Sequence, residues 1–150
     1  SNPNNAPDTQ FRIEHAVRIA KDGLVYVADR TNDRIQVFRK DGTFVKEGWI
    51  ARKTLGSGAV WDIGFSIDPA QRFIYNPDGN NETIWELVRD SLEVVGSFGS
   101  GGHFAGQFYG PHSLPVDSKG NLYITETYEG KRVQRFLYKG LGTNPVVSFP

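Results

Sequence analysis

Several features are missing from this sequence, and each absence narrows what the chain can be. There is no cysteine, which excludes disulfides, thiolate metal sites and cysteine nucleophiles but leaves the compartment open. No apolar run approaches the roughly 18 residues that a membrane helix needs, so we expect no membrane partner. Lysine plus arginine (17) equals aspartate plus glutamate (17), so no net charge draws the chain toward nucleic acid.

Methionine is also absent, even at position 1. We therefore expect the chain to start at a processing or cloning boundary, with any signal peptide already removed. That origin is compatible with a soluble protein that is secreted or periplasmic, although the sequence does not fix the compartment. Residues 1–10 are polar and predict a flexible leader.

What the sequence does contain is an internal repeat with a period of roughly 48 residues. In each copy a tyrosine is followed three residues later by an acid, and an apolar pair spaced three apart comes next. The tyrosine–acid pairs are Tyr26 with Asp29, Tyr75 with Asp78, and Tyr123 with Glu126. The pattern divides residues 11–150 into three units, at about 11–57, 58–99 and 100–150.

Each unit reads as four short strands. Residues 11–20 alternate between apolar and other side chains with a period of two, which predicts a first strand. Residues 24–28, 34–38 and 43–46 predict three more, separated by turns rich in Asp, Asn and Gly. No helical period is visible. Four-stranded units of this length predict an all-β fold, a β-propeller of antiparallel blades with three blades in the chain.

The same residues resemble the NHL-repeat family. The match is strongest over residues 25–38 and extends, with its typical Gly106-Gln107-Phe108 linker, over about residues 11–149. The middle unit departs most, since Asn76-Pro77 replaces the usual Val-Ala and Thr83 replaces an arginine. Because proline cannot donate to a ladder, we expect that strand to be distorted or locally unpaired.

Family propellers usually carry five or six blades, so three blades leave two apolar faces open. Two copies related by a two-fold axis would form a closed six-bladed ring. We therefore expect a homodimer, and the alternative is that the chain is half of a longer propeller.

Two histidines and two neighbouring residues are the candidates for chemistry at the central channel. His15 and His112 occupy the same repeat position on first strands, which line the channel of a propeller, and imidazole is a common metal ligand. The two histidines could bind a metal ion there, zinc or calcium. Alternatively, they form hydrogen bonds to water or to a backbone carbonyl. Trp61, with Asp62 beside it, can stack a ligand or fill the blade interface. Asp29 with Arg34 reads as a binding site or as a structural pair.

The chain also resembles the peptidyl-α-hydroxyglycine α-amidating lyases, in residues 27–30 and 34–36 together with His15, and in residues 111–114. That resemblance implies that His15 and His112 are zinc ligands and that Arg30 is the active-site arginine. The family's third histidine and its catalytic tyrosine have no counterpart in this chain, and Ser113 replaces a calcium-binding aspartate.

Two functions follow from these observations. The first is a non-catalytic propeller module that binds a protein, peptide or small ligand at its loop face or channel; the alternative is a zinc-dependent lyase-like enzyme. We do not expect nucleic-acid binding, because the acidic second unit interrupts the basic residues of the first and third.

Overall fold

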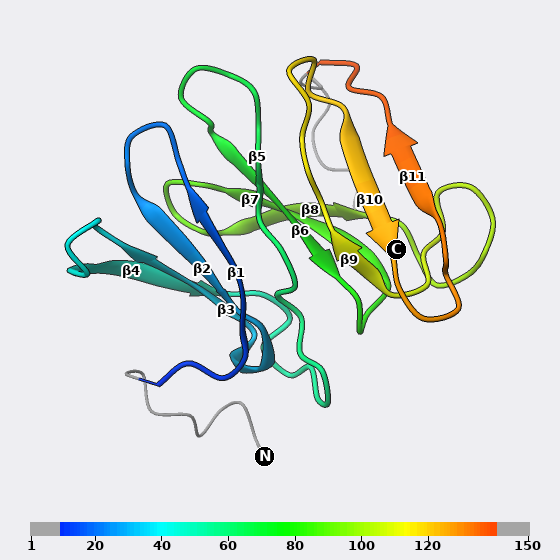
Figure 1. Ribbon diagram of the computed structural model, residues 1–150, viewed down its shortest axis with the longest axis horizontal. Coiled ribbons are helices and arrows are strands. Elements are labelled where there is room, and N and C mark those ends of the chain that lie inside the picture. The colour runs from blue at the N-terminus through cyan, green and yellow to red at the C-terminus, as the bar shows by residue number, and fades with distance from the viewer. Residues whose placement is uncertain (1–9, 141–150) are drawn as a thin grey trace.

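The computed structural model describes residues 10–140, which form three antiparallel sheets in sequence order (Figure 1). The first sheet contains β1 (Glu14–Ile19), β2 (Val25–Asp29), β3 (Arg34–Phe38) and β4 (Phe44–Trp49). The second contains β5 (Gly64–Phe65), β6 (Phe73–Asp78), β7 (Thr83–Val88) and β8 (Val94–Phe98). The third contains β9 (Pro111–Ser113), β10 (Leu122–Glu126) and β11 (Val133–Phe136). The predicted all-β class is confirmed.

Helix is nearly absent from residues 10–140, where the one helical element is the 3-10 turn η2 (Arg30–Asn32). Within that range there is no helix that could cross a lipid bilayer. The strands of each sheet are joined by tight hairpins, and glycine takes a positive φ in three of them, at Gly23, Gly42 and Gly120. Glycine adopts this conformation without the penalty that a Cβ would bring.

The core lies between successive sheets. One apolar cluster joins the first sheet to the second, and its fully buried members include Ile35, Val37, Ile74 and Leu87. A smaller cluster around Phe108 joins the second sheet to the third. Because each buried aliphatic side chain contributes about 1.5–3 kcal/mol, these two interfaces hold the sheets against one another.

The first strand is shorter than predicted and its apolar face is exposed. It begins at Glu14 rather than at Phe11, because Ile13 has a φ of 62° and interrupts the extended backbone. Val17 and Ile19 keep the predicted alternation but are 52% and 60% exposed. The alternation therefore identified the strand correctly, and none of the described residues covers these two side chains.

The proline of the middle unit has a one-sided effect. Pro77 stays in register with Ile84 of β7, so this side of β6 is regular. On the other side, β5 has only two residues, and its ladder with β6 stops at Tyr75. The expected loss of pairing thus falls on the β5 side. The expected final strand of the third unit, toward residue 149, and most of the leader lie outside the described residues.

Candidate functional site

The first strands of the three sheets, β1, β5 and β9, lie toward the middle of the molecule (Figure 1). His15 is the extra residue of a β-bulge in β1: Glu14 pairs with Asp29 and Ala16 with Ala28, which leaves His15 unpaired. His112 occupies the same place in β9, between the paired residues Pro111 and Ser113. Bulges re-aim side chains, and here two equivalent bulges direct two histidines to one point.

The two histidines meet over Trp61. The ring centroids of His15 and His112 lie 4.7 Å apart, and each ring also contacts the indole, at 5.6 and 5.2 Å respectively. Trp61 is 2% exposed, and its Nε1 donates to the carbonyl of Gly58 at 2.8 Å. The indole is therefore a buried platform whose faces are taken by side chains of this chain.

The hydrogen bond of His15 fixes the role of one ring nitrogen. Its Nδ1 lies 2.6 Å from the carbonyl oxygen of Trp61, which can only accept, so Nδ1 is the donor of this bond. His112 has a lowered pKa, mainly because it is partly buried and further because His15 and Arg30 are nearby. Its imidazole is neutral at neutral pH.

Arg30 completes the cluster from the start of η2. Its guanidinium carbon lies 4.7 Å from the centre of the Trp61 ring, a cation–π contact. Its Nε is buried and has no hydrogen-bond partner among residues 10–140. The sequence-predicted residues Arg30, Trp61, His15 and His112 are thus brought together.

Asp62 closes the floor of the cluster. Its Oδ1 binds Arg18 at 2.7 Å and the Ile63 amide at 2.8 Å. Its Oδ2 accepts from the Ser113 hydroxyl and the Leu114 amide, both at 2.9 Å. With four partners this carboxylate ties the first and third sheets to the second, and it has little capacity left for a ligand.

A small hollow of about 100 Å³ opens at this point, and we call it the channel mouth. It is lined by His15, Ala16, Arg18, Trp61, Asp62, His112 and Ser113. Sequence reasoning did not identify Arg18. Arg18 lies two residues after Ala16 on the same strand. Nothing in the local sequence indicates that it would bind an acid from another repeat, Asp62.

Asp29 belongs to a separate, closed arrangement. It is fully buried and accepts from the Arg12 amide at 2.6 Å, from Asn32 Nδ2 at 2.8 Å and from Arg34 Nε at 2.8 Å. All three partners belong to the first repeat, so Asp29 forms a contact within one unit rather than a pair between two units.

The donor set at the channel mouth is incomplete for a zinc site. Across residues 10–140 no three His, Cys, Asp or Glu side chains gather where they could hold a metal ion. His15 and His112 would supply two ligands, and the one nearby carboxylate, Asp62, is already saturated. Zinc in proteins generally takes at least three protein ligands, so the described residues do not fit it.

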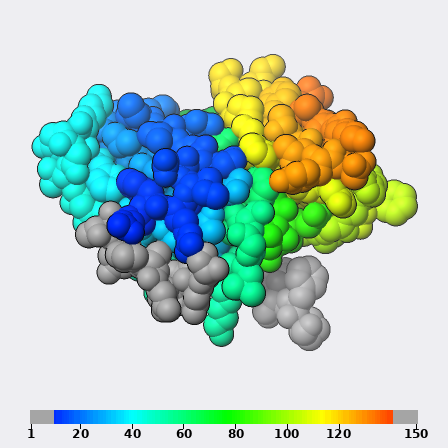
Figure 2. Space-filling view, turned by 60° about the horizontal axis from the view of Figure 1, so that its bottom comes forward, coloured from blue at the N-terminus to red at the C-terminus, as the bar shows by residue number. Residues whose placement is uncertain are grey.

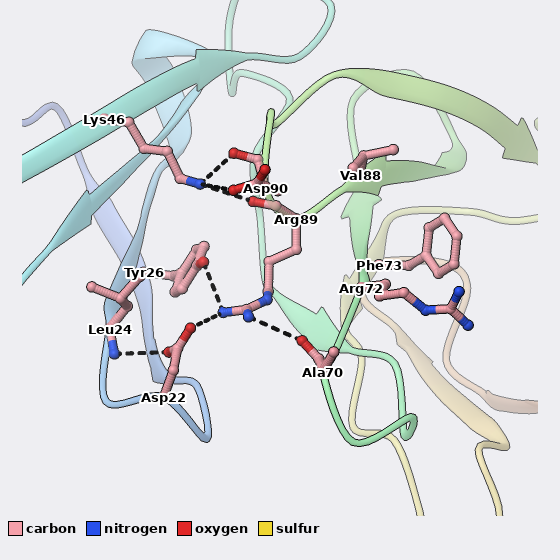
Figure 3. A pocket seen from close by; sticks show the side chains of 10 residues that line it. All are labelled: Asp22, Leu24, Tyr26, Lys46, Ala70, Arg72, Phe73, Val88, Arg89 and Asp90. Carbon is pink, nitrogen blue, oxygen red and sulfur yellow. Dashed lines mark hydrogen bonds and ion pairs between the residues drawn. The ribbon is translucent and has the colours of Figure 1, made fainter.

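A larger hollow, of about 450 Å³, lies at the opposite, hairpin end between the first and second sheets (Figure 3). Two cations bridge it. Arg89 donates to Asp22 at 2.6 Å, to the Tyr26 hydroxyl at 3.2 Å and to the Ala70 carbonyl at 3.0 Å. Lys46 donates to the carbonyls of Arg89 and Asp90. Since both cations are engaged across the sheets, this hollow is a clamp between them.

Comparisons with known proteins agree with this architecture. A model of the NHL repeat matches residues 15–38. NHL repeat-containing protein 3 of Homo sapiens is 33% identical over 145 residues, and the Mus musculus protein is 32% identical over the same length. Each alignment covers 89% of this chain and 38% of the relative, so the chain spans well under half the length of these relatives.

Solved structures share the fold at low sequence identity. Virginiamycin B lyase from Staphylococcus aureus superposes with a TM-score of 0.58 and 14% identity, over 91% of this chain and 44% of the lyase. A protein of unknown function from Bacteroides thetaiotaomicron gives a TM-score of 0.59 and 19% identity, over 79% of this chain and 32% of its own. These likenesses establish a propeller-like fold and nothing about activity. Together with the repeat match over residues 15–38 and the similarity to NHL repeat-containing protein 3, they show a chain with an NHL repeat in a propeller-like fold.

Proposed function

We propose that this chain is a non-catalytic NHL-repeat module that binds a protein, peptide or small ligand at the channel mouth and the loop face around it. The observation that carries the proposal is the convergence of His15, His112 and Arg30 on the buried indole of Trp61. Three sheets contribute to one small hollow, and convergent polar groups over an apolar platform are what small-ligand sites in proteins share.

Binding fits the chemistry of these groups better than catalysis does. A general acid or base needs a proton-transfer partner that is free to exchange protons near neutral pH. Asp62 is held by four hydrogen bonds, and His15 Nδ1 is committed to a carbonyl. What remains are the two imidazole rings and the Arg30 guanidinium beside them, which suit recognition of a polar or anionic group.

The zinc-enzyme alternative rests on His15 and His112 alone. Because the described residues offer no third ligand, we derive no catalytic step from it. Its test is direct: metal-stripped protein is titrated with zinc chloride by calorimetry, beside the His15→Ala and His112→Ala variants. We expect no stoichiometric binding. One zinc per chain, lost in both variants, would restore the alternative.

The binding proposal is tested by selection from a random peptide library displayed on phage. Peptides selected on the wild-type chain should bind His112→Ala at least about tenfold more weakly, a loss of about 1.4 kcal/mol, because the variant removes one wall of the channel mouth. Lys119→Ala, an exposed change in the β9–β10 hairpin at the other end, is the matched control. Equal affinity of the selected peptides for His112→Ala and wild type would contradict a site at the channel mouth.

We further propose that the chain contributes three blades and that a second copy completes a six-bladed ring. The support comes from equivalent positions. Ile74 and Leu87 of the second sheet are fully buried against the first, whereas the corresponding face of the first sheet leaves Val17, Ile19 and Phe44 more than half exposed. At the other end of the row, Val133 on the outer face of the third sheet is 63% exposed. A two-fold pair would bring these two faces together twice.

A further inference from the structure

A third hollow, of about 520 Å³, opens on the loop face, where β4 runs into β5. It is lined by Ala51, Arg52, Lys53, Thr54 and Asn81. Segment 50–60, coloured teal, projects from the body on this side (Figure 2). Gly58 holds the segment close to η2: a Cβ there would lie 2.0 Å from the carbonyl oxygen of Arg30. The wall of the hollow is therefore fixed by tight backbone packing.

The charge inside this hollow is uniformly positive. Arg52 and Lys53 are both exposed, and neither forms an ion pair with any residue of the described range. The Arg52 guanidinium rests 4.5 Å from the centre of the Trp49 ring, so its position is preset. None of the lining residues is acidic.

Asp33 and Asp78, in the adjoining hairpins, are turned inward. Asp33 is fully buried and accepts from the Ala59 amide at 2.8 Å. Asp78 is also fully buried and binds the side chains of Asn81 and Trp85 at 2.7 and 2.9 Å. Asp33 thus bonds to the start of the next unit and Asp78 within its own hairpin and sheet, and both carboxylates are buried away from solvent. The cations of the hollow are consequently left to an external anion.

The rest of the hollow is lined by the polar residues Thr54 and Asn81, and the apolar Leu55 lies beside it. Thr54 Oγ1 donates to the Ala51 carbonyl at 2.8 Å and accepts from Asn81 Nδ2 at 2.9 Å, so the β4–β5 and β6–β7 loops are locked together. Leu55, next along the chain, is 68% exposed. A ligand that places an anion over Arg52 and Lys53 thus meets an apolar side chain immediately beside them.

We propose that this hollow binds an acidic peptide segment, with its carboxylates on Arg52 and Lys53 and an apolar side chain against Leu55. The inference rests on the proposed loop-face binding function and adds the chemistry of the partner. A free phosphate would fill little of a hollow this size. Nucleic acid is disfavoured because two cations make a short track, and the Trp49 face that a base would stack on is covered by Arg52.

The test measures fluorescence anisotropy of a labelled peptide made of repeated Leu-Asp-Glu units. Binding should weaken as sodium chloride is raised, and the double variant Arg52→Gln, Lys53→Gln should lose about tenfold or more in affinity, because exposed charge contacts contribute modestly but add. Arg39→Gln, Lys40→Gln removes an adjacent Arg-Lys pair from the exposed β3–β4 hairpin at the other end. This control should change the affinity less than twofold.

Further arms separate the alternatives. A Leu-Asn-Gln peptide should not bind, and neither oligouridine nor inorganic phosphate should displace the acidic peptide; tighter binding of the RNA, or full displacement by phosphate, would overturn the proposal. Lys53→Gln alone, which leaves the Arg52–Trp49 contact intact, should still weaken binding, and an unchanged melting curve shows that the fold is retained. If only His112→Ala weakens binding, the hollow is the wrong site while the channel mouth stands. If only the Arg52→Gln, Lys53→Gln variant weakens binding, the hollow is the binding site and the channel mouth takes no part.

Discussion

In each repeat the second strand ends in a buried acid. The residue five or six positions later determines whether an arginine neutralises the negative charge of that acid. Arg34 binds Asp29 at 2.8 Å, and Arg132 binds Glu126 at 2.7 Å. Burial alone would raise the pKa of Glu126, but the hydrogen bonds from Arg132, Tyr109 and Gln134 lower it overall. In the middle repeat Thr83 replaces the arginine, and burial raises the pKa of Asp78.

Asp33 is the carboxyl group whose ionisation is most strongly opposed by the fold. Its pKa is raised from 3.8 to about 7, first by burial and then by the negative charge of Asp78, although hydrogen bonds from the Ala59 and Thr54 amides oppose the rise. One of its oxygens, Oδ2, is buried without a partner among the described residues. The folded state therefore holds a proton here that the unfolded chain releases.

This proton makes stability depend on pH. Between about pH 4 and pH 7 the folded chain binds one more proton than the unfolded chain, so the free energy of unfolding falls as pH rises, by at most about 1.4 kcal/mol per pH unit. Above the folded pKa the loss is complete. Asp33→Asn keeps the acceptor for Ala59 and suits the left-handed φ of 56°.

We therefore expect Asp33→Asn to raise the free energy of unfolding at pH 8 by about 1–3 kcal/mol and to change it much less at pH 4. Urea unfolding followed by tryptophan fluorescence at several pH values measures the difference between variant and wild type. Comparing this difference cancels the contributions of Glu82 and Glu86, whose pKa values are also raised, mainly by burial. A difference that stays constant from pH 4 to pH 8 would contradict the assignment.

At the scale of the elements, the hairpins after the second strands join each sheet to the next. Asp33, Glu82 and Lys131 recur at the same repeat position, and all three have a left-handed φ, between 47° and 58°. Asp33 accepts from the amide of Ala59, and Glu82 from that of Gly110 at 3.4 Å, each at the entry to the following unit. A strained hairpin residue thus serves as the connector between neighbours.

The repeat spacing predicted the order of strands and the equivalence of His15 with His112, because both follow from sequence periodicity. It did not predict the two bulges that turn these histidines toward Trp61, since a bulge depends on how two strands pair. The bonds of Asp62 to Arg18 and Ser113 were missed for a related reason. They join residues 44 or more positions apart that no local pattern connects.

The clamp at the hairpin end gives a prediction at this scale. Arg89 joins the first two sheets through two hydrogen bonds, to Asp22 and Tyr26, makes a third to Ala70 within the second sheet, and is only 16% exposed in its side chain (Figure 3). Arg89→Gln should lower the free energy of unfolding by about 1–2 kcal/mol, because charge-assisted bonds at a partly buried site are lost. Arg72→Gln, where the side chain is 57% exposed and its contact to Asp68 is 3.4 Å long, should cost less than about 0.5 kcal/mol. Equal urea midpoints for the two variants would contradict a stabilising role of Arg89 between the two sheets.

For the whole molecule, the open question is what covers the end sheets. The outward face of the first sheet carries Phe11, Val17, Ile19 and Phe44, each at least 43% exposed, around Phe38. The residues of the second sheet at the repeat positions of Ile19 and Phe44 are Ile67 and Val94, which are less exposed, at 37% and 36%. An apolar face of this kind on a monomer would favour association. Closure into a ring would bury the outward faces of the first and third sheets against each other.

Light scattering on the purified chain decides whether a second copy supplies that cover. We expect the mass of two chains, and we expect Ile19→Glu and Val133→Glu each to give the mass of one, because a carboxylate buried in either face must lose its hydration without a partner. Phe104→Glu changes a residue that is 81% exposed in the loop between β8 and β9, and it should leave the dimer intact. A wild-type monomer would remove the ring proposal, and a dimer that also dissociates with Phe104→Glu would place the interface on the loop face instead.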